Sequence, residues 1–344
     1  MKTLPELDAA QSRYLAQHAT FLAERGHEAK WLRDLRERAI ERFAALGFPT
    51  TRHEEWKYTD VRPIARFEAQ RETPSLNGLA TAGPQKWALD GAHLLVWFNG
   101  RYSPELSQIG TLPDGVTLCS MGEALAHHSE IVQQNLARFA NFENEVFPAL
   151  NTAFFEDGAL IHVPSNVVIE APIHLLFLSS GGSHSQPRNL FLVGDNSKVT
   201  IIEEYAAKTA GDAAYFCNAV TEVSVGKNAE VDHYKVTLEA DAAFHVATMQ
   251  VQQDRDCRFS SHSITFGGQF VRNQVNAIMG GSGIETTLNG LYVGGANQVL
   301  DNHTVMDHAE PHCASHETVM GKFKKRQRYS GQTREPPTFF SNRT

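Results

Sequence analysis

The stretch RNLFLVGDNSKVTIIEEY, residues 188–205, decides the fold. An apolar run leads into a turn of glycine, aspartate and asparagine, and a second run rich in β-branched residues follows. A pattern of this kind predicts two β-strands joined by a tight turn. Four further segments repeat the plan, and they cover residues 159–178, 220–239, 244–264 and 277–305.

The five segments recur with a loosely regular period. The residues that follow the turns are Val167, Val199, Val231, Phe259 and Ile284, spaced by 32, 32, 28 and 25 positions. No helical pattern separates the segments, which argues against alternating strands and helices. The period is typical of a β-helix, in which each coil stacks on its neighbour. The alternative is a β-sandwich, which would need more hairpin turns of the Asn-Gly kind than the sequence holds.

The N-terminal part of the chain has a helical period instead. Its apolar stripe consists of Trp31, Leu35, Ala39, Phe43 and Leu46. Gly47 and Pro49 predict the end of this helix, because glycine and proline follow helix C-termini. Thr51 and Glu54 have the spacing of a capping box, which predicts the start of another helix there.

We therefore predict a mainly β chain with three regions. Residues 1–90 form an N-terminal helical region, and residues 91–317 form the β-helix core with one helix near 121–140. Residues 318–344 form an irregular tail, which carries seven basic residues and one acidic residue.

Composition excludes several classes of protein. The 344 residues are 42% hydrophobic and 20% charged, as in ordinary globular proteins, and the net charge of −8 does not favour binding to nucleic acid or to an anionic membrane. The apolar runs at 94–98 and 175–178 are too short to span a membrane. The first residues lack an apolar signal core, so we expect a cytoplasmic protein. The four cysteines lie too far apart for a disulfide framework, a zinc knuckle or a cluster-binding motif.

The segment DNHTVMDHAEPHCASHE, residues 301–317, is rich in metal-ligand residue types. The candidate metal ligands in it are His303, His308, His312 and Cys313. A strand over 301–308 would point His303 and His308 to opposite faces, so they could not share an ion within that strand. Pro311 opposes a helix that would align the later histidines. The alternative is that these histidines only form hydrogen bonds at the edge of the solenoid.

The residues alone are also compatible with two other functions. The carboxylate pairs Glu203–Glu204 and Asp254–Asp256 could serve a β-helix enzyme that acts on polysaccharide. Neighbouring carboxylates on a strand face opposite sides, however, so we expect most of them to be solvated. The other alternative is a cytoplasmic β-helix that only binds partner proteins.

Several stretches together resemble the SufB/SufD family, and SufD most, which are scaffold subunits of the SUF iron–sulfur cluster assembly system. The similar stretches begin with PTTRHEEWKYTDV at 49–61 and LLVWFNGRYSPELS at 94–107, and they continue with residues 149–178, 187–205 and 294–317 in the family's order. The resemblance extends from about residue 40 to 317. It implies a right-handed parallel β-helix flanked by helical segments.

The resemblance also implies a role without catalysis. A SufD-like subunit pairs with a SufB-like subunit through the β-helix, and each binds a SufC-like ATPase. No permanently bound cofactor is expected, and a transient iron–sulfur cluster forms at the subunit interface of the full complex. The histidine that the family uses in assembly lies in a CSHG-like motif, which is missing here, so no assembly role passes to the histidines of 303–316.

The resemblance ends where the basic tail begins. The last β-coils and the C-terminal helices that hold SufC in the family have no match after residue 317, so SufC binding is not expected from this chain alone. The tail reads like translation in a shifted frame or an interrupted gene. An alternative reading frame after codon 317 that encodes a further β-coil and a CSHG-like motif would support this hypothesis, and its absence would contradict it.

Overall fold

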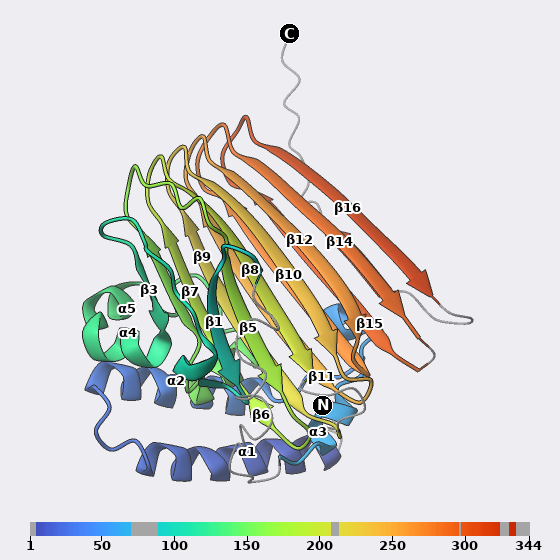
Figure 1. The fold of residues 1–344 in the computed structure, drawn as a ribbon. Helices are drawn as coiled ribbons and strands as arrows, with labels where there is room; N and C mark the ends of the chain where they lie inside the picture. The colour runs from blue at the N-terminus through green and yellow to red at the C-terminus, as the bar shows by residue number, and fades with distance from the viewer. Residues whose placement is uncertain (1–4, 70–88, 208–212, 296, 324–329, 335–344) are drawn as a thin grey trace.

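The computed structural model describes residues 5–69, 89–207, 213–295, 297–323 and 330–334. Over these residues, strands wind into a β-solenoid of about six turns, with a helical region at its N-terminal end (Figure 1). The predicted β-helix is therefore confirmed. The sandwich alternative is wrong, because neighbouring strands along the solenoid run parallel.

The solenoid has two sheets, and from β7 onward successive strands alternate between them. Sheet A has the strand order β16-β14-β12-β10-β8-β5-β1-β2, and sheet B has the order β17-β15-β13-β11-β9-β7-β4-β3. The strands of sheet A are β1 His93–Phe98, β2 Arg101–Tyr102, β5 Ile173–Ser179, β8 Lys198–Ala207, β10 Glu230–Glu239, β12 Arg258–Gly267, β14 Glu285–Gly294 and β16 Ala314–Phe323. Those of sheet B are β3 Thr117–Ser120, β4 Ala159–Val163, β7 Arg188–Val193, β9 Phe216–Val225, β11 Phe244–Gln253, β13 Phe270–Met279, β15 Val299–His308 and β17 Ser330–Arg334, and the short β6 His184–Ser185 pairs with β9.

The register corrects part of the predicted repeat. Val199, Val231 and Phe259 face one another in adjacent coils as expected. The residue beside Phe259 in the next coil is Thr286, not Ile284, and the bridge between Val168 and Lys198 shows that Val167 is likewise two positions early. The register follows the backbone conformation of the turns, and not the type of residue that follows each turn.

The turns stack on a residue with positive φ in each coil. This position holds Asn166, Asn196, Asn228, Asp256, Gly283 and His312. Asparagine and glycine adopt positive φ at low cost. The Nδ2 of Asn196 donates to Oδ1 of Asn166 at 2.9 Å, and the Nδ2 of Asn228 donates to Oδ1 of Asn196 at 3.0 Å. The asparagines thus form a short ladder along one edge of the solenoid.

The main core lies between the two sheets and contains mostly aliphatic side chains. At its N-terminal end, Trp97 stacks on Phe177 with ring centroids 4.7 Å apart, and Phe177 stacks on Tyr205 at 4.8 Å. The three rings occupy the same register position in β1, β5 and β8. Stacked aromatic rings of this kind couple successive coils.

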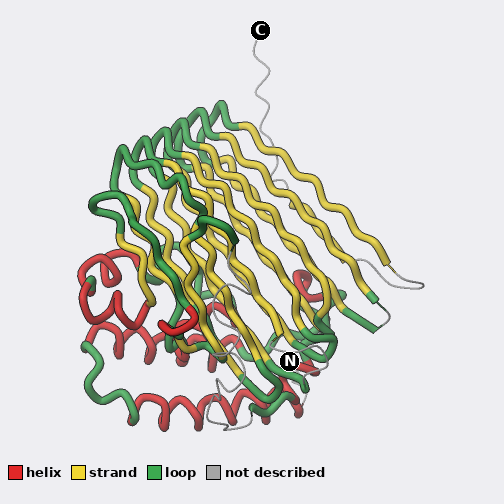
Figure 2. The backbone as a smooth tube through the Cα atoms, viewed as in Figure 1, coloured by secondary structure: helices red, strands yellow, loops and turns green. Residues whose placement is uncertain are grey.

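The helices pack against the outer face of sheet B (Figure 2). They are α1 Pro5–Ala23, α2 Lys30–Leu46, α3 Arg62–Arg66, α4 Met121–His127, α5 Ser129–Asn135 and α6 Val146–Phe154. The helix α2 ends before Gly47, which has a φ of 64°, as predicted. The capping box at Thr51 is wrong, because residues Glu54–Trp56 form one 3-10 turn without a side-chain cap. The segment predicted as one helix near 121–140 contains two short helices, which are separated at His128.

Buried charges join the helical region to sheet B. Arg188 and Glu222 lie on neighbouring strands, are fully buried, and form an ion pair of 2.5 Å. The carboxylate of Glu222 also accepts hydrogen bonds from the backbone N–H groups of Ala137, Phe139 and Ala140, at 2.8 to 2.9 Å. These bonds stabilise the loop after α5 through a charge that has no access to water.

The strand β16 continues the solenoid beyond the predicted boundary at 318. It pairs with β14 as far as Phe323, and residues 330–334 pair with β15. The tail prediction for 324–329 and 335–344 lies outside the described residues. Among the helices that the structure describes, none is long and apolar enough to cross a membrane.

Replacing Asn196 tests the turn ladder. We expect Asn196→Ala to lower the free energy of unfolding by about 1–2 kcal/mol, because alanine is strained at positive φ and cannot form the ladder bonds. Asn196→Gly keeps the backbone conformation and should cost less. Chemical denaturation measures both, and an equal loss in the two variants would contradict the role of φ.

Replacing Arg188 tests the buried ion pair. Arg188→Met leaves the charge of Glu222 buried without its partner, so we expect a loss of about 3–5 kcal/mol in the free energy of unfolding. Lys198→Met removes an exposed ion pair with Glu230 and serves as the control, with an expected change below about 1 kcal/mol. Similar losses in the two variants would show that burial of the pair does not matter.

Candidate functional site

The predicted metal ligands lie in three separate environments. Nε2 of His303 lies 2.9 Å from Oδ1 of Asp301. Nε2 of His308 lies 3.0 Å from the hydroxyl of Ser315. His303 and His308 thus point to opposite faces of β15, as predicted. In the part of the chain that the structure describes, no three His, Cys, Asp or Glu side chains form a group that could hold a metal ion.

His312 and Cys313 are explained by the turn of the last coil. His312 has a φ of 63° and occupies the position that asparagine takes in earlier coils. Cys313 packs against the main core, and its Sγ lies 3.2 Å from the carbonyl oxygen of Gly281. Cys257 occupies the same turn position two coils earlier, where it is fully buried. The pair of residue types that suggested a metal site therefore follows from the turn geometry.

The other three cysteines are buried thiols. Burial raises the pKa of both Cys119 and Cys257 to about 12, and it raises that of Cys217 further. A thiol with a raised pKa is a poor nucleophile and a poor metal ligand. These cysteines therefore contribute to packing, in agreement with the prediction from sequence.

A polar cluster lies inside the solenoid, among the apolar core. Lys235 contacts Nε2 of His245 at 3.0 Å and Oδ1 of Asn273 at 2.5 Å. Nδ1 of His245 lies 2.9 Å from the carboxylate of Glu239, to which the hydroxyl of Tyr215 donates. Burial lowers the pKa of Lys235 to about 8, although the negative charges of Glu203 and Glu239 act to raise it. Buried charges are costly, and here they are retained by mutual pairing.

Glu203 belongs to the same interior and is an exception to the prediction that most carboxylates are solvated, whereas Asp254 and Asp256 are exposed as predicted. It is 1% exposed, and it accepts hydrogen bonds from Thr221 at 2.8 Å and from Asn189 at 3.1 Å. Its neighbour Glu204 faces outward and lies 2.9 Å from Nε2 of His174. The two carboxylates thus face opposite sides as expected. The alternating pattern of residues 230–239 could have predicted this cluster. His233, Lys235 and Glu239 lie on the same face of β10 as Val231, and that face points into the core.

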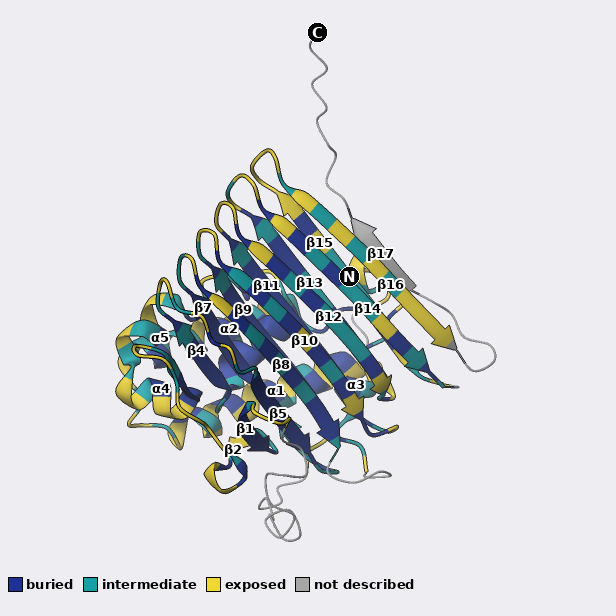
Figure 3. Cartoon of the chain, turned by 45° about the horizontal axis from the view of Figure 1, so that its top comes forward, coloured by how far each residue is buried: buried dark blue, intermediate teal, exposed yellow. Residues whose placement is uncertain are grey.

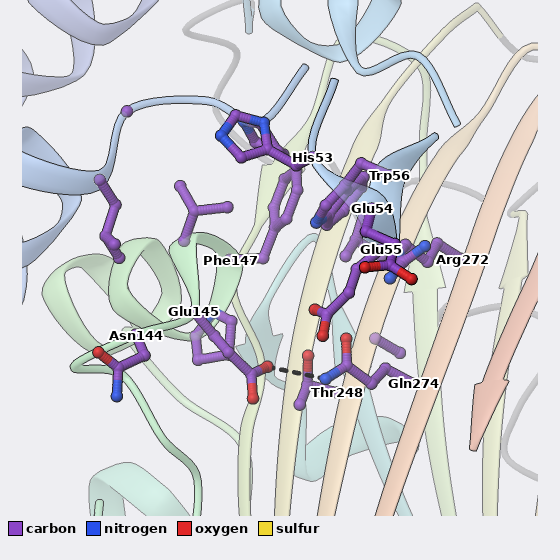
Figure 4. Close-up of a pocket in the computed structure, with 17 residues that line it drawn as sticks. His53, Glu54, Glu55, Trp56, Asn144, Glu145, Phe147, Thr248, Arg272 and Gln274 are labelled. Atoms are coloured by element: carbon purple, nitrogen blue, oxygen red, sulfur yellow. Dashed lines mark hydrogen bonds between the residues drawn. The ribbon is translucent and has the colours of Figure 1, made fainter. Parts of the chain in front are cut away.

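A pocket of about 320 Å³ opens between the N-terminal region and sheet B. We call it the N-terminal pocket; its walls are residues 46–56 and 144–148 and parts of β11 and β13 (Figure 4). Trp56 and Phe147 form an aromatic wall with ring centroids 5.3 Å apart. Glu55 and Glu145 direct their carboxylates toward the same space, and Nε2 of Gln274 donates to Glu145 at 2.9 Å.

Burial and charge act on Glu145 together. Burial raises its pKa to about 7, and the negative charge of Glu55 contributes in the same direction. The hydrogen bond from Gln274 and the charge of Arg272 oppose this shift. A carboxyl that titrates near neutral pH in a pocket marks a candidate functional site.

His303 connects to this pocket through Asp301. Besides its contact with His303, the buried carboxylate of Asp301 accepts hydrogen bonds from Thr59 and from Arg272. The guanidinium of Arg272 in turn lies 3.9 Å from the ring centroid of Trp56. Burial opposes ionisation of Asp301, but the bonds and charges of His303 and Arg272 hold its pKa below the usual value. His303 therefore contacts the carboxylate that holds Arg272, and Arg272 lines the pocket.

The titration of Lys235 gives a pH test of the interior cluster. The unfolded chain keeps the lysine proton to about pH 10.5, whereas the folded chain loses it near pH 8, so the unfolded state binds more protons between these values. Relative to Lys235→Gln, the wild-type free energy of unfolding should rise by about 2 kcal/mol from pH 8 to 10. A difference that stays constant over this range, in denaturation experiments, would contradict the buried titration.

Comparison with known proteins identifies the family. The sequence model described as "SufBD protein N-terminal region" matches residues 11–175, and the one described as "SUF system FeS cluster assembly, SufBD core domain" matches residues 176–328. The second match continues past residue 318, where the resemblance was predicted to end. The two matches meet within β5, so the solenoid contains parts of both.

Curated relatives carry the same family description. The chain is 30% identical over 303 residues to an iron–sulfur cluster assembly SufBD family protein of Synechocystis sp., which covers 85% of this chain and 66% of the relative. It is 23% identical over 294 residues to the iron–sulfur cluster assembly protein SufD of Escherichia coli, and the match covers 82% of this chain and 64% of that protein. For SufD of Bacillus subtilis the identity is 25% over 245 residues, and the match covers 69% of this chain and 55% of that protein. The chain thus spans about half to two thirds of the length of these relatives, and by its sequence and its solenoid it belongs to the SufB/SufD family of iron–sulfur cluster assembly proteins.

Proposed function

We propose that this chain acts as a SufD-type scaffold subunit, without catalysis of its own, that pairs with a SufB-like subunit through its β-solenoid. The family supports a role in iron–sulfur cluster assembly. The SufD-type role is supported by the names of the relatives from Escherichia coli and Bacillus subtilis. The remaining support comes from the surface of sheet A.

One observation carries the pairing proposal: the outer face of sheet A presents apolar side chains to solvent in successive coils. Its exposed members are Leu238, Phe266, Leu291 and Met320. Leu238 lies beside Phe266 in the register, and Leu291 lies beside Met320, so the exposed residues form two neighbouring pairs on sheet A. Figure 3 shows exposed and half-buried positions along the outer strands of this sheet. Contiguous apolar patches on a soluble surface mark sites of protein interaction. The helices, in contrast, cover sheet B.

The rest of the complex is proposed by the same family reasoning. A SufC-like ATPase is a further component of the proposed complex, although this chain alone is not expected to bind it, and a transient iron–sulfur cluster forms between subunits of the full complex. No permanently bound cofactor and no partner of nucleic acid or membrane are proposed. A cytoplasmic location is proposed, in line with the cluster-assembly role.

The pairing is tested by a variant of the exposed rows. We expect Leu291→Arg to weaken binding to a co-expressed SufB-like protein at least tenfold, because a charge replaces an apolar contact at the interface. Leu15→Arg is the matched control, since Leu15 on α1 is 38% exposed and Leu291 is 39% exposed. Affinity is measured by surface plasmon resonance on the purified proteins.

Equal affinities of the two variants would contradict the proposed surface. The wild-type chain must first be shown to unfold cooperatively, as a folded protein does. If this folded chain does not bind the SufB-like protein at all, the proposed role is contradicted. Iron and sulfide uptake by the complex with the ATPase, measured by absorption under anaerobic conditions, tests the cluster-building step separately.

A further inference from the structure

We propose that the N-terminal pocket binds an organic cation, an alkylammonium or alkylguanidinium group, between the carboxylates of Glu55 and Glu145 and against the aromatic wall formed by Trp56 and Phe147. This inference does not rest on the role in cluster assembly. It follows from the charge balance, the walls and the size of the pocket.

The charge balance favours a cation. The only guanidinium that lines the pocket in the described part of the chain belongs to Arg272, and it is already paired with the buried Asp301. Glu55 and Glu145 repel each other across the open space, as the effect of Glu55 on the pKa of Glu145 shows. A cation placed between them would relieve this repulsion and form charge-assisted hydrogen bonds.

The walls of the pocket favour an organic cation over an inorganic one. Divalent metal ions need several oxygen or nitrogen ligands, and no group of three His, Cys, Asp or Glu side chains with suitable geometry exists among the described residues. Trp56, Phe147 and Pro148 instead supply apolar surface beside the two carboxylates. The stacking of Arg272 on Trp56 shows that this indole accepts a planar cation on its face.

The size of the pocket limits the ligand. A volume of about 320 Å³ is at the lower end of the range for small-molecule sites, which suits one side chain or a small amine. Lysine and arginine side chains of a partner protein and free amines share this chemistry. The experiment below separates these two sources.

Calorimetry with two matched ligands tests the proposal on the wild-type chain. Butylguanidinium carries the cation, and butylurea is a neutral molecule of nearly the same shape. We expect butylguanidinium to bind, and butylurea to bind at least tenfold more weakly. Equal binding of the two, or no binding of butylguanidinium and of the arginine peptide described below, would overturn the proposal.

The pH dependence follows from Glu145. Its carboxyl has a pKa of about 7, so the ionised form that attracts a cation is scarce at pH 6 and dominant at pH 8. The affinity for butylguanidinium should therefore rise about tenfold from pH 6 to 8, with release of a proton on binding. In Glu145→Gln the affinity should be lower, and its rise from pH 6 to 8 should be smaller than in the wild-type chain, in which Glu145 titrates beside His53, Glu54 and Glu55.

Variants locate the ligand in the pocket. Glu145→Gln and Glu55→Gln should each weaken binding at least tenfold, whereas Glu130→Gln, at an exposed position of α5, should leave the affinity unchanged. Thermal unfolding confirms that each variant is folded. Unchanged affinity in both pocket variants would overturn the proposal, even if butylguanidinium binds elsewhere.

The source of the cation is resolved by an acetylated and amidated Gly-Arg-Gly peptide. Tighter binding of the peptide than of butylguanidinium, lost in Glu145→Gln, would identify a partner's side chain as the ligand. Equal affinity would identify a free cation as sufficient. Peptide binding that is insensitive to both pocket variants would count against the pocket.

Discussion

The structure depends on the parallel stacking of coils that cannot satisfy their own backbone groups. A strand of the solenoid forms its ladder bonds only with the coils before and after it, as β10 does with β8 and β12. Unpaired N–H and C=O groups in a buried strand would cost more than the coil gains from its own contacts. The fold is therefore stable only as a stack, and every coil must return to the same register after each turn.

The turns maintain this register by a backbone property more than by a side-chain type. Positive φ recurs at one position from Asn166 to His312, while the residue itself changes among asparagine, aspartate, glycine and histidine. Where asparagines follow one another, their amides also bond between coils. This position in the last coil is held by His312, one of the residues that suggested a metal site from sequence.

Buried ion pairs hold the helical region to the solenoid. Glu222 binds the loop after α5 to sheet B through its hydrogen bonds to backbone N–H groups. Asp301 and Arg272 hold the segment that contains Trp56 and Thr59. The N-terminal pocket lies where the contact of Arg272 and Asp301 holds Trp56 and Thr59 near sheet B while the space beside Glu145 stays open. The pocket is thus a product of the joint between the two regions, and each region by itself holds only part of it.

The sequence by itself determined the solenoid, the end of α2 at Gly47 and the strand over 301–308, because these depend on local periodicity and on turn residues. It also determined that His303 and His308 face apart, since alternation along a strand is a local property. Only the tertiary structure decided that Glu203, Lys235 and Glu239 lie in one interior cluster, because their partners come from other coils. It alone brought Glu55, Glu145 and Arg272 to one pocket, since these residues lie far apart in sequence and meet only where the helical region packs on sheet B. Local patterns specify which face a side chain takes, and the packing of distant segments specifies what that side chain meets.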